Sequence, residues 1–406
     1  ILALTFGYTL IMAETSLGRM TRKSPVGAFE SFGNSRFISI GGWINAIIPI
    51  LIVPYYSVIG GWVIKYLIEY FAGHSKTLAG DAYFTTFISN GWSTEICFII
   101  FTLFTLGIIY AGVRNGIERV SKFMMPILIV LSLIIAVYSV TRPGAIEGVK
   151  YFLVPNFDHF SWMTVVSAMG QMFYSLSIAM GILITFGSYM KKDTSIEKST
   201  ENVEIFDTAI AIMAGLMIIP AVFAFSGGNA ETLKSGPALM FITIPKVFAN
   251  MGFGTAIGVV FFLLVLFAAV TSSIALTESA VSTFEDELHW SRKKSTVFMG
   301  MVMLLLGTLS CLGYGPLANF KILGMQFLDF FDFITNSVMM PIAAIATCLL
   351  VSKVVGVDKI EEEIKKDGQV FRRKKIFCFM IKYLCPLFAA IILISSVANA
   401  FGIITM

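Results

Sequence analysis

Residues 167–181 read SAMGQMFYSLSIAMG, and this stretch of an otherwise apolar run from Phe160 to Met190 decides the fold class. Each residue of an α-helix turns by about 100°, so Ser175 and Ser177 would point about 200° apart on a continuous helix. They can line one site only if the backbone unwinds there, and unwound backbone at membrane depth is tolerated only where it lines a cavity. The stretch is therefore either a helix break at the substrate or ion site of a secondary transporter, or a set of small residues packed between helices.

The composition restricts the class of protein further. Of the 406 residues, 57% are hydrophobic and 13% are charged, and the mean hydropathy is +0.84. An ordinary soluble domain carries roughly 25% charged residues. The composition excludes a soluble enzyme, a collagen, a disordered chain and a nucleic-acid-binding protein. It predicts an all-α polytopic membrane protein.

A transmembrane helix needs about 20 largely apolar residues. We predict ten such spans, in a single domain that covers residues 1–406. They are Ile1–Leu17, Gly41–Ile64, Ile96–Val113, Phe123–Thr141, Phe160–Met190, Thr208–Phe225, Thr255–Thr277, Ser295–Leu317, Phe333–Ser352 and Tyr383–Met406.

The distribution of basic residues predicts the orientation. The connectors that follow the first, third, fifth, seventh and ninth spans contain 22 of the 29 Lys and Arg residues. The positive-inside rule places these connectors in the cytoplasm and both ends of the ten-span chain outside. An N-terminus outside the cell indicates either a preceding transmembrane helix or a processed N-terminus.

Two further patterns indicate polar sites within the apolar spans. Ala268, Thr271 and Ser272 share one helix face. Their two hydroxyls and a backbone carbonyl suit a hard cation such as Na⁺. Alternatively, the hydroxyls bond to carbonyls of their own helix. Ionised carboxylates cost about 2.5–3.5 kcal/mol on insertion scales, so acids in or beside spans are functional candidates. These acids are Glu14, Asp207, Glu278, Asp329 and Asp332, of which the last two, at a span boundary, can also reach water.

Collinear motifs along the whole chain resemble the neurotransmitter:sodium symporter family, especially its bacterial amino-acid transporters. The motifs are Gly18-Arg19, Pro54-Tyr55-Tyr56, Gly116-Ile117-Glu118-Arg119, the stretch Gly170–Ser177, Thr271-Ser272-Ser273-Ile274-Ala275, Phe284-Glu285-Asp286-Glu287-Leu288 and Ser291-Arg292-Lys293. The resemblance implies one transporter domain with inverted five-helix repeats. The chain corresponds to family helices two to eleven and lacks the first, so as given it is not expected to transport.

The resemblance also implies a substrate site and two sodium sites. Tyr56 matches the tyrosine whose hydroxyl binds the substrate carboxylate. The rest of the substrate pocket matches Ile52, Tyr174, Ser177, Met180 and Leu276, a mostly apolar set that favours a hydrophobic or aromatic amino acid. The first sodium site matches Ser175 and Asp207, and the second matches the carbonyl of Ala268 and the hydroxyls of Thr271 and Ser272.

The gates of the family can be assigned in the same way. Asp332 matches the acidic residue of the outer gate, and Asp286 and Tyr189 match the inner gate. Gly116 and Pro126 resemble a motif proposed to let the family's fifth helix unwind, although a proline kink explains the same residues.

The expected function is a sodium-coupled symporter of the cell membrane that imports a small amino acid by alternating access. Its partners are this substrate, two Na⁺ ions and the lipid bilayer. The alternatives are a non-transporting receptor, scaffold or truncated fragment of the same family, and a channel. Chloride is not expected to be required, because the Asp207 carboxylate beside Na⁺ supplies negative charge; alternatively, Asp207 is a helix-end acid that faces cytoplasmic water.

Overall fold

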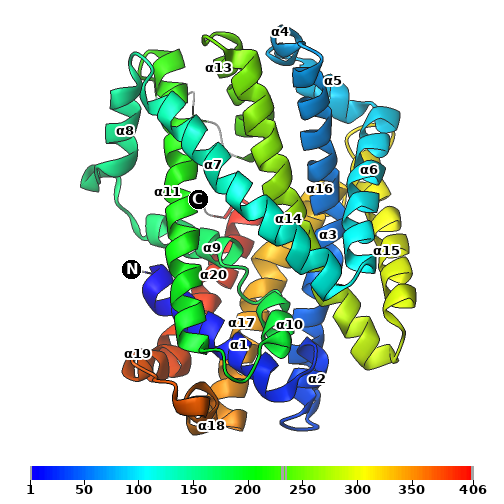
Figure 1. Ribbon diagram of the computed structural model, residues 1–406, viewed down its shortest axis with the longest axis vertical. Helices are drawn as coiled ribbons and strands as arrows, with labels where there is room; N and C mark the ends of the chain where they lie inside the picture. The colour runs from blue at the N-terminus through cyan, green and yellow to red at the C-terminus, as the bar shows by residue number, and fades with distance from the viewer. Residues whose placement is uncertain (1, 230–232, 234–235, 404–406) are drawn as a thin grey trace.

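The computed structural model describes residues 2–229, 233 and 236–403. In this part of the chain the elements are helical, apart from an isolated bridge between Ile322 and Met325. Three long helices run along the long axis of the molecule, and α7 (Arg119–Val140) crosses them at an angle (Figure 1). The long helices are α3 (Arg36–Phe71), α11 (Ile196–Ser226) and α14 (Gly254–Leu288).

Shorter helices complete the bundle. They are α1 (Tyr8–Thr21), α2 (Pro25–Glu30), α4 (Ser75–Leu78), α5 (Tyr83–Ser89), α6 (Gly91–Tyr110), α8 (Ala145–Leu153), α9 (Trp162–Ser175), α10 (Ile182–Tyr189), α12 (Gly236–Ala238), α13 (Ile244–Ala249), α15 (Arg292–Leu312), α16 (Phe327–Asp332), α17 (Met340–Leu349), α18 (Val357–Ile364), α19 (Lys374–Phe379) and α20 (Cys385–Ala400). Short π-helical segments join several of them, among them η1 (Ala3–Gly7), η2 (Val113–Glu118), η6 (Phe333–Met339), η7 (Leu350–Val355) and η9 (Met380–Leu384).

Among the described residues, eight helices are long and apolar enough to cross a membrane, rather than the predicted ten. They are Arg36–Phe71, Gly91–Tyr110, Val113–Val140, Ile196–Ser226, Gly254–Leu288, Arg292–Leu312, Phe327–Val355 and Lys374–Ala400. The first predicted span corresponds to η1 and α1, and the fifth is divided between α9 and α10. The ends of the first and last predicted spans, residue 1 and residues 404–406, lie outside the described residues.

Several observed helices are longer than the apolar runs that predict them, whereas α15 ends at Leu312, before the predicted end at Leu317. α3 continues beyond Ile64 through Lys65 and Glu69, whose side chains form an ion pair at 2.6 Å one turn apart. Such a pair supports a helix outside the apolar segment. Pro126 lies inside α7, which follows η2 without interruption, so this helix is not unwound between Gly116 and Pro126.

The predicted break in the fifth span is confirmed. α9 ends at Ser175 and α10 begins at Ile182. Between them Ser177 and Ala179 have φ angles of 53° and 59°, a left-handed conformation that is uncommon for residues other than glycine. The Glu14 side chain in α1 accepts a hydrogen bond from the Ala179 N–H at 2.9 Å, so the break has a partner inside the protein.

α1 and α10 pack with their backbones in close contact. A Cβ atom on Gly18 of α1 would lie 1.9 Å from the Ile184 carbonyl oxygen, and one on Gly187 would lie 2.5 Å from the Thr15 carbonyl oxygen. Both ends of α10 are therefore held against α1. Figure 1 places α2, α10, α18 and α19 at one end of the molecule and α4, α5, α8 and α13 at the other. Of the first group, α2, α18 and α19 lie in the basic connectors, which the positive-inside rule predicts to be cytoplasmic.

We predict that Gly18→Ala lowers the thermal stability of the full-length protein, because the new methyl group meets backbone rather than a flexible side chain. Overpacking of this kind costs about 1–3 kcal/mol. Gly107→Ala in α6 is the matched control, since nothing lies within 4 Å of its added Cβ and alanine favours a helix. Melting of detergent-solubilised protein measures both; equal melting temperatures would contradict the close α1–α10 contact.

Candidate functional site

The six predicted substrate-binding residues lie around one cavity of about 200 Å³ at the helix break. Thr271 and Ser272 of α14 also line it. Three lining residues were not predicted: Met125, Ile182 and Ala275. Met125 directly precedes Pro126, which belongs to the proposed unwinding motif noted in the sequence. The cavity is therefore bounded by α3, α7, α14 and the unwound segment.

The cavity has a polar and an apolar part. The polar part is formed by the Tyr56 and Ser177 side chains, together with Thr271 and Ser272. Ile52, Met180 and Leu276 supply buried apolar surface. Tyr174, whose side chain remains 39% exposed, also borders the cavity. The arrangement suits a small molecule with one polar and one apolar end.

Ser175 and Asp207, predicted as the first sodium site, contact each other. The Ser175 hydroxyl, at the end of α9, donates a hydrogen bond to Asp207 Oδ1 at 2.8 Å. Asp207 lies well inside α11, which begins at Ile196, so it is not the helix-end acid of the alternative interpretation. A carboxylate and a hydroxyl are both oxygen donors for a hard cation.

Ala268, Thr271 and Ser272, predicted as the second sodium site, lie on α14. The Thr271 hydroxyl donates to the carbonyl oxygens of Phe267 and Ala268, at 3.1 and 3.0 Å. The intrahelical bond expected from the alternative interpretation is thus present. The hydroxyl oxygen still has lone pairs for a cation while its proton is donated. None of the three residues is buried.

Asp332, predicted as the outer gate, ends α16 and accepts two hydrogen bonds. The Tyr55 hydroxyl donates to its Oδ1 at 3.2 Å, and Asn336 Nδ2 donates at 2.6 Å. Neither partner was predicted, although Tyr55 adjoins Tyr56 in the same motif. These contacts join α3, α16 and η6 beside the cavity.

Tyr189 and Asp286, predicted together as the inner gate, have different partners in the structure. The Tyr189 hydroxyl donates to Glu278 Oε1 at 2.7 Å, and Arg292 binds both oxygens of Glu278 at 3.1 and 2.5 Å. Asp286 Oδ2 accepts the Ser24 N–H at 2.5 Å. Glu278 was noticed only as an intramembrane acid, and it is fully buried.

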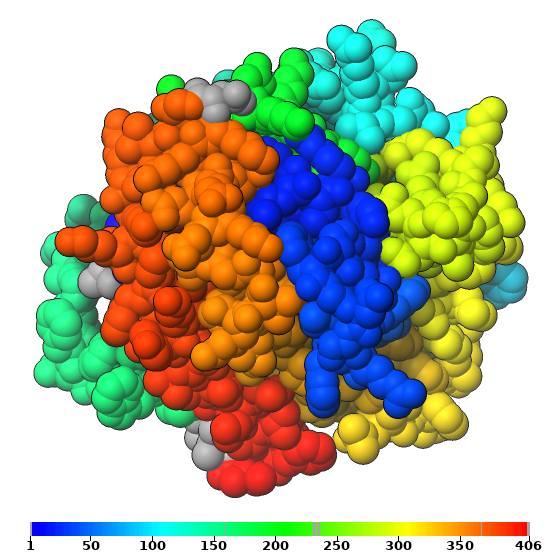
Figure 2. All heavy atoms as spheres, turned by 90° about the horizontal axis from the view of Figure 1, so that it is seen from below, coloured from blue at the N-terminus to red at the C-terminus, as the bar shows by residue number. Residues whose placement is uncertain are grey.

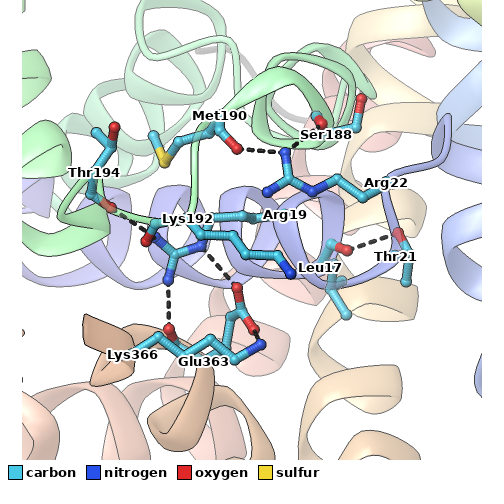
Figure 3. Close-up of polar contacts among 10 residues, drawn as sticks. All are labelled: Leu17, Arg19, Thr21, Arg22, Ser188, Met190, Lys192, Thr194, Glu363 and Lys366. Carbon is cyan, nitrogen blue, oxygen red and sulfur yellow. Dashed lines mark hydrogen bonds and ion pairs between the residues drawn. The ribbon is translucent and has the colours of Figure 1, made fainter. Parts of the chain in front are cut away.

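A second network, at the end of the molecule predicted to be cytoplasmic, centres on Arg19, which is 2% exposed. Its Nε donates to Glu363 Oε1 in α18 at 2.7 Å, and one terminal nitrogen donates to the Thr194 carbonyl at 2.6 Å (Figure 3). Arg22 donates to the Ser188 carbonyl at 3.0 Å. These contacts join α1, the end of α10 and α18. Gly18-Arg19 is one of the motifs noted in the sequence, but the partner of Arg19 could not be predicted from it.

Glu361, two residues before Glu363 in α18, forms ion pairs with two lysines. Hydrogen bonds from Lys365 and Lys374 hold the pKa of the Glu361 carboxyl below its usual range. α18 therefore keeps paired charges on its exposed face and Glu363 on its buried face.

Comparison with known proteins gives consistent matches along the chain. Residues 86–403 match the model of the sodium:neurotransmitter symporter family. The chain is 31% identical to an uncharacterized sodium-dependent transporter, YhdH, from Bacillus subtilis, over 98% of this chain and 88% of that protein. It is 29% identical to an uncharacterized sodium-dependent transporter from Haemophilus influenzae, over 97% of this chain and 88% of that protein. The crystal structure of MhsT in complex with L-phenylalanine aligns with a TM-score of 0.85 at 31% identity, covering 97% and 89% of the two chains.

We predict that Arg19→Gln destabilises the full-length protein, because it removes the buried guanidinium from the Glu363 carboxylate and leaves only Lys366, a half-exposed cation, as its partner. Removing one partner of a buried ion pair costs about 3–5 kcal/mol. Lys150→Gln is the matched control: its pair with Glu147 is exposed, and such pairs contribute about 0–1 kcal/mol. Thermal unfolding in detergent compares the two variants, and an Arg19→Gln protein as stable as the control would rule out the structural role of this pair.

Proposed function

Because the chain belongs to the sodium:neurotransmitter symporter family, we propose that it imports a small hydrophobic or aromatic amino acid together with Na⁺, by alternating access. The chain is a sodium-dependent transporter of this family, a multi-pass integral membrane protein and not an enzyme. The observation that carries the proposal on the substrate is the cavity at the helix break, which combines Tyr56 and Ser177 with Ile52, Met180 and Leu276.

The polar and the apolar parts of the cavity bind different parts of the substrate. The Tyr56 hydroxyl donates a hydrogen bond to the substrate carboxylate. Carbonyl groups left free by the unwound segment, together with the Ser177 hydroxyl, accept hydrogen bonds from the ammonium group. The apolar side chains exclude a charged substituent, since an unpaired charge there would lose its hydration. MhsT, the similar transporter, was crystallised with L-phenylalanine, which supports the proposed substrate class.

Two sodium sites supply the driving force in this proposal. Ser175 and Asp207 bind one ion, and the Ala268 carbonyl with the Thr271 and Ser272 hydroxyls binds the other. Each ion that moves inward gains about 2.3 kcal/mol per 100 mV of membrane potential, in addition to its concentration gradient. Asp332 acts as an outer gate beside Tyr55, and Asp286 and Tyr189 act at the cytoplasmic side.

Uptake of labelled amino acids into proteoliposomes that contain the full-length protein tests the proposal. We expect sodium-dependent uptake of phenylalanine or leucine and none of lysine. Tyr56→Phe should weaken substrate binding at least tenfold, because an unpaired buried charge costs about 1.5–3 kcal/mol. Binding without uptake would favour a receptor, and uptake that persists without a sodium gradient would contradict symport.

We predict that Thr271→Ala and Ser272→Ala each weaken sodium dependence, because each removes an oxygen ligand from the second site. The sodium concentration that half-saturates substrate binding should rise several-fold in both variants. Thr283→Ala is the control, since it deletes a hydroxyl of the same helix that bonds to the Ser279 carbonyl and does not line the cavity. Unchanged sodium titrations in both test variants would refute the second sodium assignment.

We predict that transport does not require chloride. Asp207 places a fixed carboxylate at the first sodium site, and opposite charges a few ångströms apart attract strongly away from bulk water. Replacement of chloride by gluconate should therefore leave uptake unchanged, whereas Asp207→Asn should make uptake weak or newly chloride-dependent. A parent protein that stops transporting in gluconate would remove Asp207 from this role.

A further inference from the structure

A groove with apolar walls lies between α3 and α17, near the cytoplasmic ends of both helices. It encloses about 460 Å³ and adjoins a second hollow that shares Ile40 and Ile44 with it. On the space-filling face of Figure 2, the orange segment that contains α17 and α18 lies beside the blue segment that contains α2 and the start of α3. This is the end of the molecule that carries the basic connectors.

Each wall of the groove is a helical stripe that ends in a cation. On α3, Arg36 is followed at intervals of three or four residues by Ile40, Ile44 and Ile47. On α17 and η7, Ile342, Ile345 and Leu349 are followed in the same way by Lys353. Residues at this spacing share a helix face. Because α3 begins and η7 ends at the cytoplasmic side, both stripes bring their cations to the same end of the groove.

Arg36 and Lys353 are exposed, and neither forms a hydrogen bond or an ion pair with any described residue. No Asp or Glu lines either hollow. Other cytoplasmic cations, such as Arg19 and Arg292, are bound by carboxylates. The N-terminus of α3, which has no side-chain cap, adds partial positive charge beside Arg36. The Glu30 carboxylate, beside the second hollow, is bound by the Ser39 hydroxyl at 2.7 Å rather than by either cation. Arg36 and Lys353 therefore bring two cations to this end of the groove without a carboxylate bound to either of them among the described residues.

We propose that this groove binds an anionic phospholipid of the cytoplasmic leaflet, with its phosphate between Arg36 and Lys353 and an acyl chain along the isoleucine stripes. The groove is lined mostly by aliphatic side chains, together with Phe29 and Phe37, and such a surface suits a flexible acyl chain. Trp43, which lines the second hollow, is an amphipathic ring of the kind found at the headgroup level. A second copy of the chain is disfavoured as the occupant, because a symmetric contact would bring the same two cations together.

Native mass spectrometry of the purified full-length protein tests the proposal with phosphatidylglycerol and phosphatidylcholine of identical acyl chains. A cation near a membrane surface contributes about 1 kcal/mol of attraction to an anionic lipid, or about fivefold in affinity. We therefore expect the parent to bind phosphatidylglycerol at least tenfold more tightly, and the double variant Arg36→Gln/Lys353→Gln to bind both lipids equally.

Two controls distinguish the groove from general charge. Arg114→Gln removes an exposed cytoplasmic cation away from the groove and should keep the preference. Ile345→Trp, which fills the groove, should weaken binding of both lipids. Equal binding of the two lipids by the parent, or a preference that survives in the double variant, overturns the proposal. So does displacement of the lipid by millimolar inorganic phosphate, which would indicate a simple anion site, or a dimer that Ile345→Trp dissociates.

Discussion

Backbone that leaves a helix inside a membrane must find hydrogen-bond partners within the protein, because the hydrocarbon offers none. Between Ser175 and Ile182 the Ser177 and Ile178 N–H groups bond to carbonyls at the end of α9, and the Ala179 N–H is bound by the buried side chain of Glu14. The acid lies in α1, and α1 packs so closely on α10 that only glycine fits at position 18. The position of the break therefore depends on a neighbouring helix as well as on its own residues.

The break determines which side chains can reach the cavity. With the backbone unwound, Ser177 and Met180 line the cavity, while Ser175, only two residues before Ser177, contacts Asp207 on α11. A continuous helix would turn the two serines about 200° apart around a single axis. Here one unwound segment serves two adjoining sites, and a change in its path would alter both of them. The proposed substrate and ion contacts in this region would thus be mechanically linked through a few backbone torsions.

Much of this architecture could be predicted from local pattern. Polar and glycine residues within the apolar run marked the break. The six substrate-site residues, which lie around one cavity, followed instead from the resemblance to a known family. Pairings between distant helices could not be predicted, because spacing along one helix does not determine which neighbour it meets. Tyr189 therefore pairs with Glu278 rather than lying with Asp286, and Arg19 finds Glu363 across the bundle. Helix ends were also missed, since hydropathy does not register charged residues that extend a helix, as in α3 beyond Ile64.

In the proposed alternating-access cycle, ion pairs at the end predicted to be cytoplasmic bear on how that end can open. Arg19–Glu363 and Arg292–Glu278 are ion pairs whose acids are buried. Separation of such charges in a dry interior would cost far more than either pair contributes to stability. If water enters as the helices separate, it hydrates both partners and offsets most of that cost. Opening and hydration must therefore occur together, so the pairs act as a barrier to a dry, partly open state rather than as a large bias toward the closed one.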